Sequence, residues 1–189
     1  MKNDDVLIVK GFLNDAVSKP LFDSLLKNTV WHSDLLSDTG ETVTIRRGMA
    51  YEEVNPTLSK PYKYANLSLP ASFLSYETKM ILAHIKSSFS YDFNSCLLNL
   101  YKDGRDEIRW HSDREEQLGE NPIIGMISLG SNRTFHMMNK ETKERQQYLL
   151  ENGDLFIMLE NCQANWLHAV LKEKQITTPR ISLTFRKVL

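Results

Sequence analysis

The sequence predicts a mainly β fold of the α+β class: an antiparallel sandwich or jelly roll with N-terminal helices packed on one sheet. Two observations lead to this prediction. Residues 18–89 contain two segments in which apolar side chains recur with helical spacing, whereas the chain from about residue 94 onward contains short β-rich runs separated by turn residues. Strands that follow a group of helices typically form a sheet that the helices cover on one face.

The N-terminal part is predicted to begin with a strand at residues 6–9 and a helix soon after it. Ser18 offers a helix cap and Pro20 suits a first helical turn, and apolar residues with helical spacing follow. A second helix is predicted over residues 71–88, where apolar side chains again recur with helical spacing.

The C-terminal part is predicted to be a series of short strands with glycine and asparagine turns between them. The predicted strands cover residues 97–101, 123–129, 133–138, 147–150, 154–159 and 180–186. No repeat, low-complexity tract or flexible linker interrupts the chain, and 189 residues are enough for one substantial hydrophobic core. We therefore expect a single domain over residues 1–189, with the jelly-roll core at about 94–189.

The composition, 41% hydrophobic and 25% charged, is that of an ordinary globular protein, and the apolar stretches are too short to span a membrane. Residues 1–5 lack the basic start and apolar core of a secretory signal. We therefore expect no membrane association and a cytoplasmic location, or a nuclear one in a eukaryote. Cys96 and Cys162 lack the CxxC spacing of structural zinc sites, so we interpret them as small buried hydrophobic residues.

The net charge of -1 gives the protein no overall attraction for nucleic acid, so any such binding has to be local. The best candidate segment is residues 44–64, in which basic side chains are interleaved with Tyr51, Tyr62 and Tyr64. Cations interleaved with aromatic rings suit contacts to a nucleic-acid backbone and its bases. The alternative is a solvated surface hairpin, which composition alone favours.

A candidate metal site comes from His111 and Asp113, whose side chains project from the same face of an extended backbone because they are two residues apart. His168 can supply a third ligand from a distant segment. Two histidines and one carboxylate leave three positions open on an octahedral metal, the arrangement in which non-haem iron(II) oxygenases bind a chelating cosubstrate and dioxygen. Zinc would favour a tighter four-coordinate site. The spacing by itself is also compatible with no metal.

Residues 180–186 alternate polar and apolar side chains with a period of two. The apolar face is predicted to point into a core, and Arg180 and Arg186 into the space that the strands enclose. Two enclosed guanidinium groups need anions, because a buried unpaired charge loses several kcal/mol of solvation. A dicarboxylate cosubstrate would supply these anions, and arginine matches carboxylates with its forked donors. The alternative is an edge strand whose arginines face water.

Several motifs between residues 31 and 186 have the order and spacing found in one known family. They are Asn99-x-Tyr101, His111-x-Asp113-x-Glu115, Pro122-Ile123-Ile124, Ser128-Leu129-Gly130, Arg133-Thr134-Phe135, Gly153-Asp154-Leu155, Gln163-x-x-Trp166-x-His168 and Arg180-x-Ser182-x-Thr184-Phe185-Arg186. On these residues the chain resembles the AlkB family of Fe(II)/2-oxoglutarate-dependent nucleic-acid demethylases. The resemblance implies a double-stranded β-helix (jelly roll) core, iron(II), 2-oxoglutarate and dioxygen as cofactors, and His111, Asp113 and His168 as the catalytic metal ligands.

The resemblance also implies a cosubstrate site. Asn99 and Tyr101 would hydrogen-bond 2-oxoglutarate, Arg180 would pair with its distal carboxylate, and Arg186 would lie near the metal-proximal end. Ser182 departs from the family pattern, which usually has asparagine at this place. We therefore expect one cosubstrate hydrogen bond to be lost or to be made through water.

For the substrate, the resemblance implies that Glu115 sits beside the target base and that residues of about 31–70 form a lid over it. Tyr64, in a segment similar to the lid motif of the family, is expected to contact a base or the strand. Arg47 and Tyr51 are further candidates for substrate contacts. From the residues alone, Glu115 is only the start of a charged loop.

The implied reaction is the oxidative removal of methyl groups from 1-methyladenine and 3-methylcytosine in alkylated DNA or RNA, single- or double-stranded, with release of formaldehyde. A carboxylate at Glu115 would favour these cationic bases over their unmethylated forms. Two alternatives stay open: the same chemistry on a small molecule, peptide or protein, and a metal-binding jelly roll without catalysis. We expect a monomer.

Overall fold

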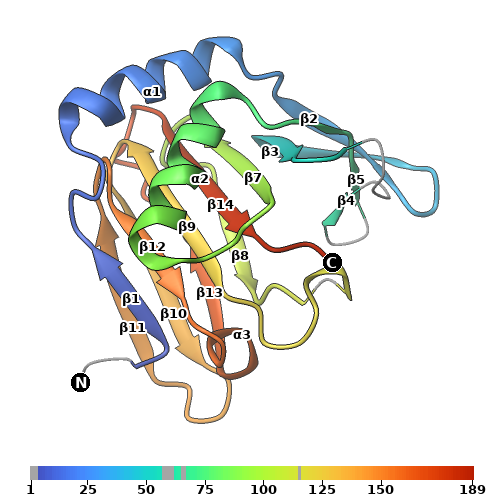
Figure 1. Cartoon of the computed structure of the whole chain (residues 1–189). Coiled ribbons are helices and arrows are strands. Elements are labelled where there is room, and N and C mark those ends of the chain that lie inside the picture. Colours follow the sequence, from blue (N-terminus) through green and yellow to red (C-terminus); the bar gives the residue numbers. More distant parts are fainter. Residues whose placement is uncertain (1–3, 57–61, 65–66, 115) are drawn as a thin grey trace.

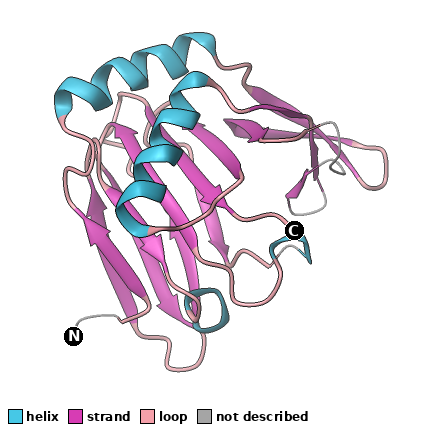
Figure 2. Ribbon diagram, viewed as in Figure 1, coloured by secondary structure: helices cyan, strands magenta, loops and turns pink. Residues whose placement is uncertain are grey.

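The structure is a computed structural model that describes residues 4–56, 62–64, 67–114 and 116–189, with the backbone alone at 62–64. The described strands form two sheets, one of ten strands and one of four, which face each other as a sandwich (Figure 1). Two long helices, α1 (Asp15–Asn28) and α2 (Tyr76–Phe89), lie on the outer face of the larger sheet (Figure 2). This arrangement confirms the predicted mainly β fold with N-terminal helices on one sheet.

The larger sheet is centred on the last strand of the chain, β14 (Arg180–Arg186). Its order is β1 (Val6–Val9), β12 (Leu155–Met158), β9 (Ile124–Gly130), β14, β7 (Ser95–Tyr101), β3 (Thr42–Glu53), β2 (His32–Ser37), β5 (Leu67–Leu69) and β4 (Tyr62–Tyr64), with β6 (Ala71–Phe73) paired to β3. Because β14 is hydrogen-bonded to β7 on one side and to β9 on the other, its inward side chains lie deep in the sandwich.

The smaller sheet has the order β11 (Arg145–Leu150), β10 (Arg133–Asn139), β13 (Trp166–Val170) and β8 (Ile108–His111). A 3-10 turn, η1 (Glu116–Leu118), follows β8, and the short helix α3 (Cys162–Asn165) leads directly into β13. The pairing of β8 with β13 places His111 directly opposite His168. Two of the predicted metal ligands therefore come together through sheet register.

The two faces of β14 separate as the sequence predicts. Ile181, Leu183 and Phe185 are buried in the apolar core between the larger sheet and the helices. Ser182 and Arg186, on the other face, line a cavity between the two sheets. A second apolar cluster shares several residues with the lining of this cavity, and its buried members include aromatic residues of β10, β12 and β13. The strand is therefore an interior strand with one apolar and one functional face.

The start of α1 differs from the prediction. The helix begins at Asp15, and Asn14 caps it by accepting a hydrogen bond from the backbone N–H of Val17. The predicted cap at Ser18 is therefore wrong. Ser18 lies inside the helix and is buried, and its hydroxyl accepts a hydrogen bond from Asn152 Nδ2 at 2.6 Å. Asparagine and serine are comparably good caps, so the local sequence did not distinguish the two positions.

The predicted start of the second helix at residue 71 is also wrong. Ala71–Phe73 forms the short strand β6, which pairs in parallel with β3, and α2 begins only after Ser75, whose hydroxyl accepts the Thr78 N–H. A short run of apolar residues is compatible with a buried strand or with a helix, and here its pairing with β3 makes it a strand.

The segment from β2 to β6 extends the larger sheet, and β2 and β3 form an antiparallel hairpin. The strand is exposed near the hairpin turn, at residues 42–44, as the solvated-hairpin alternative expects, but it is buried from residue 47 to 53, where Met49 and Tyr51 belong to a third apolar cluster. Cys96 and Cys162 are buried thiols without a disulfide, as predicted. Among the described residues, no helix combines the length and the apolar character that a membrane span requires.

Candidate active site

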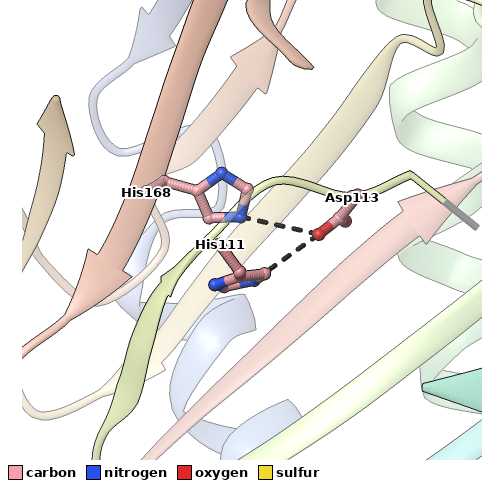
Figure 3. Close-up of side chains that lie close together, drawn as sticks. All are labelled: His111, Asp113 and His168. Carbon is pink, nitrogen blue, oxygen red and sulfur yellow. Dashed lines mark ion pairs between the residues drawn. The ribbon is translucent and has the colours of Figure 1, made fainter. Parts of the chain in front are cut away.

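Three side chains, His111, Asp113 and His168, lie close together in the lining of the cavity (Figure 3). His111 ends β8, Asp113 follows two residues later, and His168 lies in the middle of β13. Asp113 Oδ1 lies 3.5 Å from His111 Nε2 and 3.6 Å from His168 Nε2. These separations exceed a normal hydrogen bond, and the donor atoms of all three residues lie within 4.8 Å of one another. The three sequence-predicted ligands therefore converge on one point.

His111 is prepared to bind a metal through Nε2. Its Nδ1 lies 2.7 Å from the carbonyl oxygen of Arg109, so the Nδ1–H donates there and the lone pair stays on Nε2. Burial, together with the nearby His168, lowers the pKa of His111 to about 4. The imidazole is therefore neutral at physiological pH, which is the form that coordinates metals.

Asp113 uses its two carboxylate oxygens differently. Arg186 donates to Oδ2 from Nε at 3.0 Å and from Nη2 at 2.5 Å. Burial opposes ionisation, yet the charge of Arg186 and the contacts with the two histidines hold the pKa of Asp113 well below its usual range. Among the described residues, Oδ1 has no hydrogen-bond partner, although it is fully buried. An ionised oxygen that points at two histidine nitrogens is what a metal ion requires.

The donor set indicates which metal fits. Two imidazole nitrogens and one carboxylate oxygen on one side of a metal leave the remaining positions open for other ligands. This set is typical of non-haem iron(II) oxygenases, whereas structural zinc sites are closed by four protein ligands. The residues present therefore fit iron(II).

The predicted cosubstrate residues surround the same cavity. Asn99, Tyr101 and Ser182 line it together with the three ligands and Arg186. Asn99 and Ser182 are direct neighbours across the β7–β14 pair, because the register places them opposite each other. Two strands of the larger sheet thus form the floor of the cavity, while β8 and β13 carry the histidines above it.

Arg180 lies on the same face of β14 as Ser182, two residues before it, and is 1% exposed, although it is not among the residues that line this cavity. Its Nε donates to Ser128 Oγ at 2.9 Å, and its guanidinium carbon lies 5.3 Å from the centre of the Tyr101 ring. Burial lowers the pKa of Arg180 to about 10, so the group still carries its charge at neutral pH. Nη1 is buried and has no hydrogen-bond partner among the residues that the structure describes. A carboxylate would satisfy this donor, so the residues also fit 2-oxoglutarate.

The predicted substrate residues are placed less closely together. Arg47 is buried on β3, and its Nε donates to Asn99 Oδ1 at 2.9 Å, so it lies against the cosubstrate residues. Tyr51 is buried in the third apolar cluster, and burial raises its pKa to about 12. Glu115 lies outside the described residues, and of Tyr64 the structure describes only the backbone in β4.

Two buried residues at the site were given no role in the sequence analysis. Arg133 begins β10, is 1% exposed, and lies 5.4 Å from the centre of the Tyr101 ring. It donates to the carbonyl oxygens of Asp106 and Leu171, which fixes two loops beside the cavity. Gln163, in α3, accepts a hydrogen bond from the Asp113 backbone. Gln163 and Arg133 both stand in segments that carry the AlkB resemblance, Gln163-x-x-Trp166-x-His168 and Arg133-Thr134-Phe135, and this was the available signal for both.

Comparison with known proteins agrees with this geometry. The sequence model of the 2OG-Fe(II) oxygenase superfamily matches residues 5–186. The chain belongs to this superfamily. The group formed by His111, Asp113 and His168 could hold the iron(II) for which this superfamily is named, with 2-oxoglutarate as the cosubstrate.

Relatives within the superfamily confirm the AlkB resemblance. The chain is 31% identical to the alpha-ketoglutarate-dependent dioxygenase alkB homolog 3 of Homo sapiens, over 97% of its own length and 66% of that protein. It is 27% identical to the DNA oxidative demethylase ALKBH2 of Arabidopsis thaliana, over 98% of its length and 67% of the relative. The solved structure of OsALKBH1 shares the fold, with a TM-score of 0.66 at 14% identity, covering 99% of this chain and 100% of that one. The chain thus spans slightly less than two thirds of alkB homolog 3.

Proposed function

We propose that this dioxygenase is an oxidative demethylase that removes N-methyl groups from 1-methyladenine and 3-methylcytosine in DNA or RNA. The observation that carries the proposal is the complete His111, Asp113 and His168 set, with Arg180 and Arg186 enclosed beside it, in a chain similar to a DNA oxidative demethylase. Hydroxylation of the methyl carbon gives an unstable N-hydroxymethyl base, which releases formaldehyde and leaves the unmethylated base.

Each residue of the site has a place in this reaction. Bound iron(II), together with 2-oxoglutarate and dioxygen, supplies the oxidising chemistry. Arg180 would bind the distal carboxylate of 2-oxoglutarate through its buried guanidinium, and Asn99, Tyr101 and Ser182 would orient the cosubstrate from the cavity floor. Arg186 donates to one oxygen of Asp113 and favours its ionised form, and the other oxygen would bind the metal.

The substrate has to present a methyl group at the open end of the cavity, where the side chain of His111 is 24% exposed. In a duplex this requires the methylated base to leave the stack, whereas single strands offer it directly. We propose that residues of about 31–70 act as the lid that holds the extruded base, with contacts from Tyr64, Arg47 and Tyr51. Glu115 would stabilise the positive charge of the methylated base.

A panel of methylated oligonucleotides tests the proposal. The protein is incubated with iron(II), 2-oxoglutarate and single- or double-stranded DNA or RNA that carries one methylated base, and products are weighed by mass spectrometry. We expect loss of one methyl group from 1-methyladenine and 3-methylcytosine, with formaldehyde and succinate in equal amounts. An Asp113→Asn variant is the matched control, because it removes the ligand charge at nearly constant shape. No demethylation of any oligonucleotide by active dioxygenase would contradict the proposal.

A second candidate is hydroxylation of a small molecule, peptide or protein by the same site. The net charge of -1 favours it, because proteins that bind nucleic acid through phosphates are usually basic. Binding of methylated oligonucleotide at several salt concentrations separates the two functions. A demethylase should bind more weakly as salt rises, and the absence of binding at low salt would leave the second candidate.

A further inference from the structure

The side chain of Gln163 lies beside the predicted metal ligand Asp113, and both ends of its amide contact protein groups. Gln163 is the second residue of α3, five residues before His168, and it is 3% exposed. Its Oε1 accepts the backbone N–H of Asp113 at 2.8 Å, and its Nε2 lies 3.2 Å from Met158 Sδ. Both ends of the amide are therefore used, and the orientation of the side chain is fixed.

This hydrogen bond joins two segments that are far apart in the sequence. Asp113 lies in the loop after β8, where no sheet hydrogen bonds hold its backbone, because β8 ends at His111. Gln163 belongs to the helix that leads into β13, the strand of His168. The bond thus ties the segment of one ligand to the segment of another at a distance of 2.8 Å.

Lys140 secures the same connection from the end of β10. Its Nζ donates to the backbone oxygen of Gln163 at 2.6 Å and to Ser112 Oγ at 3.1 Å. Its backbone N–H donates to the carbonyl oxygen of Asn165 at 2.8 Å, at the other end of α3. The helix that carries Gln163 is therefore held in place independently of Asp113.

We infer that Gln163 is a positioning residue that sets the affinity of the site for its metal by fixing the backbone of Asp113. Arg186 orients the Asp113 carboxylate by donating to Oδ2, and Gln163 fixes the backbone of Asp113 by accepting its N–H. Partners of metal ligands of this kind typically change metal affinity by 10- to 100-fold when they are removed. Gln163 need not contact the substrate to have this effect, because it would act on metal binding, which does not depend on the substrate.

Metal binding to the metal-free protein tests the inference without measuring turnover. Co(II) is titrated into the wild type and into Gln163→Met, which keeps the length of the side chain and removes the amide oxygen, and binding is followed calorimetrically. We expect the dissociation constant for Co(II) to rise about 10- to 100-fold in Gln163→Met. Amide exchange at Asp113, followed by NMR in the metal-free protein, should accelerate in the same variant. A folded Gln163→Met protein that binds Co(II) like the wild type overturns the inference.

Two further variants separate positioning from the general packing of α3. Gln163→Glu keeps an oxygen that can accept the Asp113 N–H, so it should retain most of the affinity. Cys162→Ala trims the buried neighbour in the same helix without touching the hydrogen bond, so it should lower thermal stability and leave Co(II) affinity unchanged. If Gln163→Glu binds as weakly as Gln163→Met, or if Cys162→Ala weakens binding equally, the inference is wrong. This comparison also covers the case in which Gln163→Met does not fold.

Discussion

Asp113 stabilises the fold as well as holding the metal, because its carboxylate neutralises the 3% exposed side chain of Arg186. Asp113→Ala would remove the carboxylate that pairs with this buried guanidinium. We expect the free energy of unfolding to fall by about 3–5 kcal/mol, the usual cost of breaking a buried ion pair from one side. Urea unfolding of the metal-free proteins measures this loss.

His111→Ala is the matched comparison for Asp113→Ala. The histidine is neutral and partly exposed, so its removal leaves no buried charge behind. Both variants should lose succinate formation, while only Asp113→Ala should lose several kcal/mol of stability. Equal stabilities of the two variants would show that Arg186 finds another partner in the folded protein.

The position of Arg47 indicates a role at the cosubstrate site. Because it donates to Asn99, Arg47→Met should disturb the cosubstrate end of the cavity first. We expect KM for 2-oxoglutarate to rise about fivefold to tenfold, which corresponds to about one hydrogen bond. Steady-state kinetics with either substrate varied will measure it. A rise confined to the KM of the methylated oligonucleotide would instead support the substrate contact that the family resemblance implies.

At the scale of elements, the strands with clear alternation were the easiest to predict. β14 has the predicted bounds, and its two faces divide between core and cavity because period-two alternation directly encodes a strand with two different surroundings. β6 and the start of α2 were predicted wrongly, since the parallel pairing of β6 with β3 is a long-range contact that no local pattern announces. Helix caps failed for a related reason: Asn14 and Ser18 are equally plausible until Asn152 is known to bind Ser18.

An exposed charge cluster connects two elements and predicts a pH dependence. Asp92 accepts hydrogen bonds from Lys86, in the last turn of α2, and from Lys187, directly after β14. These two lysines lower the pKa of Asp92 from its ordinary value of 3.8 to about 2. The cluster therefore stabilises the fold above about pH 4, and this contribution is lost as the pH falls from 3.8 towards 2.

Asp92→Asn tests this dependence. The variant should be less stable than the wild type at pH 7, and the difference should shrink in urea titrations as the pH is lowered from 5 to 3. Because the Asp92 side chain is 60% exposed, 1 M salt should also reduce the difference. A difference that is independent of both pH and salt would assign the effect to something other than charge.

At the scale of the whole molecule, the site depends on both sheets. The sequence predicted that His111, Asp113 and His168 would come together, because His111 and Asp113 are only two residues apart and project from one face of an extended segment. It did not predict the hydrogen bonds of Arg133 to two loops beside the cavity or of Gln163 to Asp113, because these contacts are made across elements rather than along them. Nor did it predict the strands β2 to β5, which form only by adding to an edge of the larger sheet.

The contact between Asp113 and Arg186 has one more consequence, since it joins the loop after β8 of the smaller sheet to β14 of the larger one. The carboxylate of the metal site thus also forms an ion pair that links the two sheets of the sandwich. A redesign that replaces the aspartate by another ligand, for example to accept a different metal, would remove this link unless Arg186 were replaced at the same time. A substitution of Asp113 therefore changes both metal binding and the contact between the two sheets.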